Sequence, residues 1–122
     1  MAELHDLTAL EQGSLVAAGE LTSVELTEHY LERASRLDDV GAFVLLTAER
    51  AVEQARAADA SRRTAGSGRP LHGVPTAIKD LNLTAGVPTR FGSPAFADVV
   101  PEVSDAVTEA IEAAAMPSLG KT

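Results

Sequence analysis

The amino-acid sequence predicts an α/β fold in which helices cover a small sheet. Its apolar residues are mostly aliphatic residues and alanine, and aromatic residues make up only 3% of the 122 positions. This composition suits helices packed on a sheet better than an aromatic-rich binding module. Segments of helical periodicity also alternate with short β-like runs, in the order helix–helix–strand–helix–strand–helix. That order lacks the regular βαβ alternation of a doubly wound dinucleotide-binding fold.

Two helices are expected in the first forty residues. Residues 7–19 predict a short helix that ends near Gly19. The run Thr22-Ser23-Val24-Glu25 then has the form of a capping box, in which residues one and four cap each other. The helix that it begins should end near Asp38-Asp39, because apolar side chains recur at helical spacing up to that point.

The middle of the chain predicts a strand and a long helix. Residues 42–46 form a brief β-like run, and Thr47 is the expected N-cap of a helix over residues 48–64. The apolar face of this helix consists of alanines, so the helix should pack closely against another element. Residues 64–70 predict a flexible break.

The last third predicts a strand, an irregular segment and a helix. Residues 74–83 form an apolar strand, and 86–89 form a turn. Residues 90–103 contain prolines and glycine and should be irregular. Ser104 or Asp105 is the expected cap of a helix over 106–115, in which the apolar face comprises Val107, Ala110, Ile111 and Ala114. Residues 118–122 resemble the end of a strand that runs into a loop.

Charge and cysteine content exclude several classes of protein. The net charge of −8 disfavours nucleic acid or an anionic membrane as a partner. There is no cysteine, and the three histidines (His5, His29 and His72) are too far apart to form a zinc-binding motif. We therefore expect no metal or other cofactor. No signal peptide or membrane-spanning stretch is visible, which makes the cytoplasm the expected compartment.

Three motifs have a structural interpretation that outweighs the functional one. The glutamates on and beside the second helix form a solvated acidic face. His72 precedes a glycine in a loop, where a structural hydrogen bond is favoured over a role as a base. The run Ala115–Thr122 resembles a phosphate-binding loop, but a helix precedes it where that loop needs a strand, and Pro117 removes a backbone amide.

Lys79 is the main candidate for chemistry. It is one of only two lysines, and it lies in the apolar run 74–83 beside Asp80. A lysine in such a run must extend its amine to solvent, pair with a carboxylate, or lose its proton. The first outcome describes an ordinary lysine at a sheet edge. The last describes a desolvated general base, for which the chain shows no nucleophile nearby.

A longer stretch around Lys79 resembles the amidase signature family. It comprises Pro70-Leu71-His72-Gly73-Val74-Pro75-Thr76-Ala77-Ile78-Lys79-Asp80, followed by Gly86-Val87-Pro88-Thr89 and Gly92-Ser93-Pro94-Ala95-Phe96. The flanking segments occur in the order found in such enzymes, including the capped helix at Thr22, the alanine-rich helix and the terminal Gly120-Lys121-Thr122. The resemblance covers nearly the whole chain.

The resemblance implies an amidase-signature mixed sheet covered by helices and a hydrolase of carbon–nitrogen bonds in small-molecule amides. Members of the family use a Ser–cis-Ser–Lys triad. Lys79 corresponds to the lysine, which accepts a proton through the bridging cis-serine and so activates the nucleophilic serine. Burial would have to lower the pKa of this lysine, and an apolar strand is a place to achieve that.

The chain departs from the family pattern at its end. Both triad serines and the oxyanion amides follow Gly-Lys-Thr in such enzymes, so they lie beyond Thr122. Pro117 should remove a ladder hydrogen bond, which places the last strand at an edge or damages it. We therefore expect residues 1–122 to be the N-terminal part of a single amidase domain, truncated before the serine- and glycine-rich segment and inactive alone.

Two alternatives stay open. The same family includes the A subunit of glutamyl-tRNA(Gln) amidotransferase, which hydrolyses glutamine to supply ammonia, and the sequence does not separate it from a general amidase. The other is a non-catalytic remnant that self-associates or needs a separate remainder. An interrupted sheet leaves an unpaired edge and exposed apolar surface, so we expect partial disorder or self-association.

Overall fold

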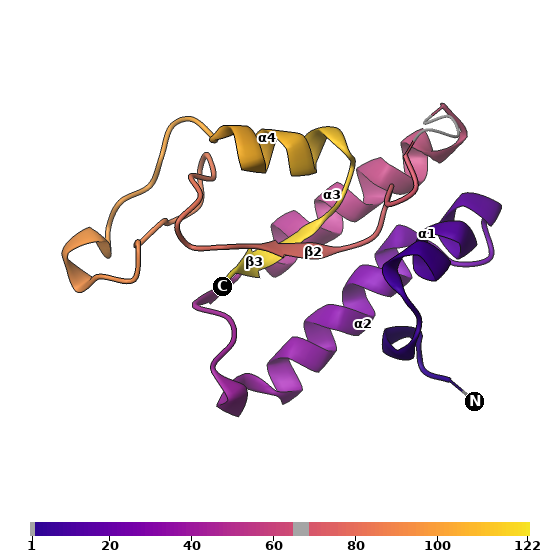
Figure 1. Cartoon of the computed structure of the whole chain (residues 1–122), viewed down its shortest axis with the longest axis horizontal. Helices are drawn as coiled ribbons and strands as arrows, with labels where there is room; N and C mark the ends of the chain where they lie inside the picture. Colours follow the sequence, from indigo (N-terminus) through magenta and orange to yellow (C-terminus); the bar gives the residue numbers. More distant parts are fainter. Residues whose placement is uncertain (1, 65–68) are drawn as a thin grey trace.

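The computed structural model describes residues 2–64 and 69–122, so most of the predicted flexible break at 64–70 lies outside the described residues. Short 3₁₀ helices occur at Leu4–Asp6, Asp38–Val40, Arg62–Thr64 and Pro94–Phe96. In chain order, the main elements are α1 (Ala9–Ala18), α2 (Ser23–Arg36), β1 (Leu45–Leu46), α3 (Ala48–Ser61), β2 (Thr76–Ile78), α4 (Ala106–Ala113) and β3 (Ser118–Lys121). The expected α/β order is confirmed (Figure 1).

The three strands form one mixed sheet in the order β1-β3-β2. β3 pairs antiparallel with β1 and parallel with β2, with Leu46 opposite Gly120 and Ile78 opposite Lys121. The register of the parallel pair shifts between Thr76 and Ile78, as at a β-bulge. The last strand of the chain is therefore the central strand, and the C-terminus lies beside the sheet (Figure 1).

The expectation that Pro117 puts the last strand at an edge, or damages it, is wrong. β3 begins one residue after Pro117, so the missing amide does not belong to the ladder. The carbonyl oxygen of Pro117 still accepts a hydrogen bond of 2.8 Å from the amide of Thr76. A proline just before the first residue of a strand is compatible with a central position.

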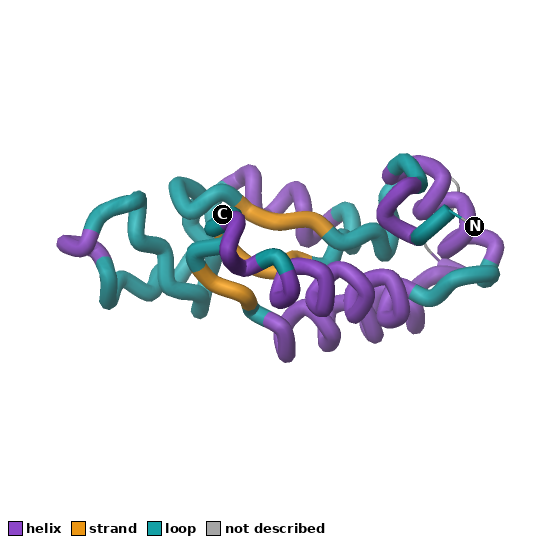
Figure 2. Tube along the Cα trace, turned by 90° about the horizontal axis from the view of Figure 1, so that it is seen from below, coloured by secondary structure: helices purple, strands orange, loops and turns teal. Residues whose placement is uncertain are grey.

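Helices α2 and α3 pack together and contribute buried residues to the core. Ala51, Ala55 and Ala58 of α3 are at most 2% exposed, as the alanine face predicted, and α3 packs on β3. α2 lies along α3 and contributes the fully buried Leu26. Figure 2 shows the strands as a thin layer with helices along it. Small side chains on α3 are what let the helix approach the sheet closely.

Side-chain caps mark where α1, α2 and α4 begin. The predicted capping box at Thr22 and Glu25 is present, and a second one joins Thr8 and Glu11 at the start of α1. Hydrogen bonds from the hydroxyl and the amide of Thr22 hold the pKa of Glu25 below its ordinary value. Thr47 occupies the N-cap of α3, but its side chain makes no capping hydrogen bond and instead points to the carbonyl of Ser118 at 3.4 Å.

Several predicted elements are longer than the structure shows. The strand expected at 74–83 is limited to Thr76–Ile78, and the run at 42–46 pairs only at Leu45–Leu46. α4 is also shorter than 106–115, and its expected apolar face is not packed, because Val107 is 51% exposed while Thr108 is fully buried. Local periodicity does not decide which face meets the core.

Asp105 allows a test of how one cap depends on pH. Hydrogen bonds from the amide of Thr108, the side chain of Asn82 and the amide of Leu83 lower its pKa. A carboxylate with a lowered folded-state pKa contributes stability that is present above its ordinary pKa and is lost as the pH falls through the folded value.

We expect Asp105→Asn to keep much of the cap and to remove this titration. Urea unfolding at about pH 6 and about pH 3 should therefore show a larger loss of stability for the native chain than for the variant. Glu11 and Glu25 titrate in both proteins and cancel from the comparison. Equal losses in both proteins would contradict the assignment.

Candidate active site

Lys79 directly follows β2, and the backbone on both sides of it is hydrogen-bonded. The amide of Thr122 donates to the carbonyl of Ile78 at 3.0 Å, and the amide of Asp80 donates to the carbonyl of Thr122 at 2.7 Å. The carbonyl of Lys79 itself accepts from the amide of Asn82 at 2.9 Å. The Cα of Lys79 is thus held between the end of β3 and a turn.

The side chain of Lys79 is exposed, so within these residues the edge-lysine outcome holds and the burial that the family resemblance would require is not present. β2 is an outer strand of the sheet, and Lys79 lies just past its end, where its neighbours Ile78 and Asp80 turn inward. Alternation along the chain then directs Lys79 outward. In the described part of the chain, this amine has the environment of an edge lysine.

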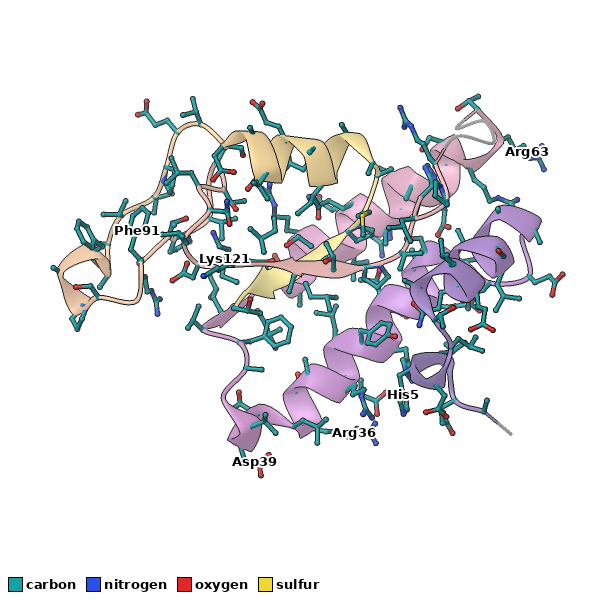
Figure 3. All side chains as sticks on the ribbon, viewed as in Figure 1. His5, Arg36, Asp39, Arg63, Phe91 and Lys121 are labelled. Atoms are coloured by element: carbon teal, nitrogen blue, oxygen red, sulfur yellow. The ribbon has the colours of Figure 1, made fainter. Side chains whose placement is uncertain are left out.

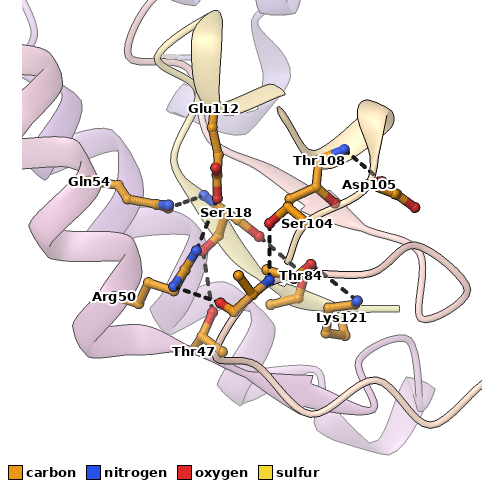
Figure 4. Close-up of polar contacts among 12 residues, drawn as sticks. Thr47, Arg50, Gln54, Thr84, Ser104, Asp105, Thr108, Glu112, Ser118 and Lys121 are labelled. Carbon is orange, nitrogen blue, oxygen red and sulfur yellow. Dashed lines mark hydrogen bonds and ion pairs between the residues drawn. The ribbon is translucent and has the colours of Figure 1, made fainter. Parts of the chain in front are cut away.

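The lysine that the structure buries is Lys121, at the end of β3. It is 1% exposed, and Figure 3 shows it beside the junction of β2 and β3. Its ammonium donates to the carbonyl of Asn82 and to the hydroxyls of Thr84 and Thr89, both at 3.3 Å. Figure 4 shows Lys121 and Thr84 in contact. The carboxylate of Asp80 lies 3.9 Å from the same nitrogen.

Burial lowers the pKa of Lys121, and the negative charges of Asp80 and Asp105 oppose this effect. An ammonium has three donors, and here each has an acceptor. Hydrogen bonds to the charged form favour that form, so the site is built for a charged amine. Asp80 is also buried, and it accepts from the amide of Arg90 at 3.2 Å.

Lys121 was missed by the sequence analysis, which treated it only as part of Gly120-Lys121-Thr122. The criterion that selected Lys79, a lysine within a short β-like run, would also have selected Lys121. Lys121 is the other of the two lysines, and it also lies in a short strand. Of the outcomes open to a lysine in a strand, Lys79 takes exposure and Lys121 takes pairing with a carboxylate.

The other predicted sites have structural roles. Nε2 of His72 lies 2.7 Å from the carbonyl of Ala58 and donates to it, as favoured, which ties the loop before β2 to α3. The phosphate-loop alternative does not fit, because Lys121 lies within β3 with its donors already used. Residues 2–64 and 69–122 contain no group of three or more potential ligands that could hold a metal ion.

The glutamates on and beside α2 are exposed, as a solvated face predicts. None of the helices in the described ranges is long and apolar enough to cross a membrane.

Comparison with known proteins gives consistent matches. Residues 25–122 match the family model described as Amidase. The chain is 43% identical over 120 residues to the A subunit of glutamyl-tRNA(Gln) amidotransferase from Thioalkalivibrio sulfidiphilus, a match that covers 98% of this chain and 25% of that protein. It is 44% identical over 124 residues to the corresponding protein of Salinispora tropica, again over 25% of its length.

Solved structures agree with the fold. The native peptide amidase from Stenotrophomonas maltophilia matches with a TM-score of 0.82 and 32% identity, over 96% of this chain and 24% of that one. A structure described as a vestigial protein complex that reveals the origins of an s-triazine catabolic enzyme matches with a TM-score of 0.87 and 27% identity, over 94% and 26%. The chain spans about a quarter of the length of the curated relatives that it matches. With a family model matched over residues 25–122 and relatives above 40% identity, the chain belongs to the amidase signature family.

Proposed function

We propose that residues 1–122 form the N-terminal part of a single amide-hydrolase domain and contribute its lysine base, Lys79, to a Ser–cis-Ser–Lys triad. The observation that supports this most is the placement of Lys79. Its backbone is clamped at the end of the sheet by Thr122, while its amine is directed away from the core. A fixed backbone with a free amine is suited to a group that must reach a partner outside these residues.

The exposure of Lys79 is compatible with this role. A lysine acts as a base near neutral pH only when burial or positive charge lowers its pKa. The matched relatives are about four times as long as this chain. In this proposal, a further segment carrying both serines covers Lys79 and completes the site. The chain alone, with neither that segment nor its oxyanion donors, is inactive.

The test is a chimera. Residues 1–122 replace the matching quarter of the Stenotrophomonas maltophilia peptide amidase, to which the chain aligns over 96% of its length. We expect the chimera to hydrolyse a peptide amide and the chain alone to hydrolyse none. A chimera that folds cooperatively but is inactive would contradict the proposal. Hydrolysis by the chain alone, abolished by Lys79→Met, would show that its own residues supply the nucleophile.

Glutamine hydrolysis for a tRNA-dependent amidotransferase is the second candidate. Relatives with that name are 40–44% identical over nearly the whole chain, compared with 32% for the peptide amidase. In this proposal, the acyl pocket that selects the substrate is formed by residues outside 1–122. The codons that follow Thr122 in the gene would therefore discriminate between the two candidates.

A non-catalytic, self-associating role is the remaining candidate and stays a prediction. Val100, Val103 and Val107 are each at least 51% exposed. β1 and β2 are the outer strands of the described sheet. Exposed apolar side chains and sheet edges both favour association.

A further inference from the structure

The two lysines of the chain meet at one point of the sheet, although 41 residues separate them in the sequence. Lys121 pairs in register with Ile78, the residue before Lys79. One amine is buried and one is exposed. The buried lysine is therefore adjacent to the proposed base without being able to contact a substrate.

The three hydrogen-bond acceptors of Lys121 and its ion-pair partner Asp80 all belong to the segment that follows Lys79. Asp80, Asn82, Thr84 and Thr89 all lie within the next ten residues. The segment has no regular secondary structure, and its far side is hydrogen-bonded to the chain at 99–105, for example from the amide of Gly86 to the carbonyl of Pro101 and from the amide of Thr89 to the carbonyl of Val99, both at 2.9 Å. A buried ammonium requires an acceptor for each donor, and the acceptors of Lys121 join the near side of this segment to the end of β3.

The folded segment also determines the backbone of Lys79. Asp80 donates its amide to the carbonyl of Thr122 and accepts the amide of Arg90 on its carboxylate, so both its backbone and its side chain are held. Asn82, whose carbonyl binds Lys121, donates its amide to the carbonyl of Lys79. The contacts of Lys121 therefore constrain the backbone of Lys79 by two routes, one through Asp80 and one through the turn at Asn82.

We propose that Lys121 is a positioning residue for Lys79: through Asp80 and the turn at Asn82, it holds the direction in which Lys79 leaves the sheet. The inference rests on the proposed function of Lys79. Buried ion pairs commonly add little net stability compared with apolar residues, so stability alone is a weak reason for a lysine here. Holding the loop 80–89 in one geometry is a better reason for a buried lysine at this position.

The first experiment uses the 122-residue chain and needs no activity. Selective isotope labelling of lysine gives two side-chain signals, and Lys79→Met assigns them. We expect the Lys121 ammonium to exchange slowly with water. In Lys121→Met, exchange of the Asp80 amide should accelerate about tenfold or more, while the amides of Ala51 and Ala55 in α3 change little. If that variant does not fold, Thr84→Val removes one acceptor and serves instead.

The second experiment uses the active chimera. Lys121→Met should lower kcat about tenfold to a hundredfold with KM nearly unchanged, because a misdirected base reacts slowly while substrate binding is retained. Lys121→Arg should recover part of kcat. The matched control is Gln54→Ala, which removes the 2.9 Å contact from the amide of Ser118 at the other end of β3. It should lower the melting temperature and leave kcat unchanged.

The outcomes separate the inference from the proposed function. If the chimera without further substitutions folds but is inactive, the proposed role of Lys79 is contradicted. The hydrogen-exchange data on the Asp80 amide then decide whether Lys121 orders the backbone beside Lys79. If Lys79→Met abolishes activity but Lys121→Met behaves like Gln54→Ala, the positioning role is overturned while the function stands. An unchanged Asp80 amide in Lys121→Met overturns the positioning role directly.

Discussion

Replacing Lys79 with methionine in the chimera is expected to lower kcat/KM by about 10²- to 10⁴-fold, the range that a positioned general base contributes. Methionine keeps the length of the side chain and removes the amine. The side chain is exposed in this chain and makes no hydrogen bond or ion pair among residues 2–64 and 69–122. The folded structure of residues 1–122 should therefore be preserved, and the loss should appear in steady-state rates alone.

Two further variants make this prediction specific to proton transfer. Lys79→Arg retains the positive charge, but a guanidinium cannot give up its proton at any relevant pH, so activity should stay low. Arg63→Met removes another exposed charge far from β2 and should leave kcat/KM unchanged. An active Lys79→Arg enzyme would show that Lys79 supplies charge and not a base.

Replacing Gly120 with alanine is expected to destabilise the fold by roughly 3 kcal/mol. Gly120 lies in the central strand with φ +152°, and a Cβ there would lie 2.0 Å from the carbonyl oxygen of Leu45 in β1. The added carbon would push β1 away from β3. Free energies of unfolding from urea titration would measure the loss.

Gly41→Ala separates the steric effect from the conformational one. Gly41 also has a positive φ, +69°, but a Cβ there would meet no atom within 4 Å. We expect a loss of about 1 kcal/mol for this variant, from backbone strain alone. Similar losses at the two positions would argue that β1 does not approach β3 as closely as the structure shows.

The sequence predicted what depends on near neighbours. The capping box at Thr22 and the end of α1 at Gly19 were identified, and the cap of α4 was narrowed to Ser104 or Asp105, of which Asp105 is the cap, because each involves contacts within about four residues. The alanine face of α3 was also predicted, because helical spacing is a local property. The motif around Lys79 led to the family before any geometry was known.

Tertiary structure decided which lysine is buried. Lys79 lies just past the end of β2 and Lys121 is the last residue of β3, and alternation along a strand does not by itself tell which of its two faces the core covers. The difference arises because β3 is the central strand and β2 an outer one, an order set by pairing between residues that are 42 to 76 positions apart. Burial of Lys121 further requires the segment 80–89 to fold back over it. Sequence alone therefore determined the order of the helices, the caps of α1 at Gly19 and of α2 at Thr22, and the family, whereas the strand order, the exposure of Lys79 and the site around Lys121 depend on long-range contacts that local patterns do not encode.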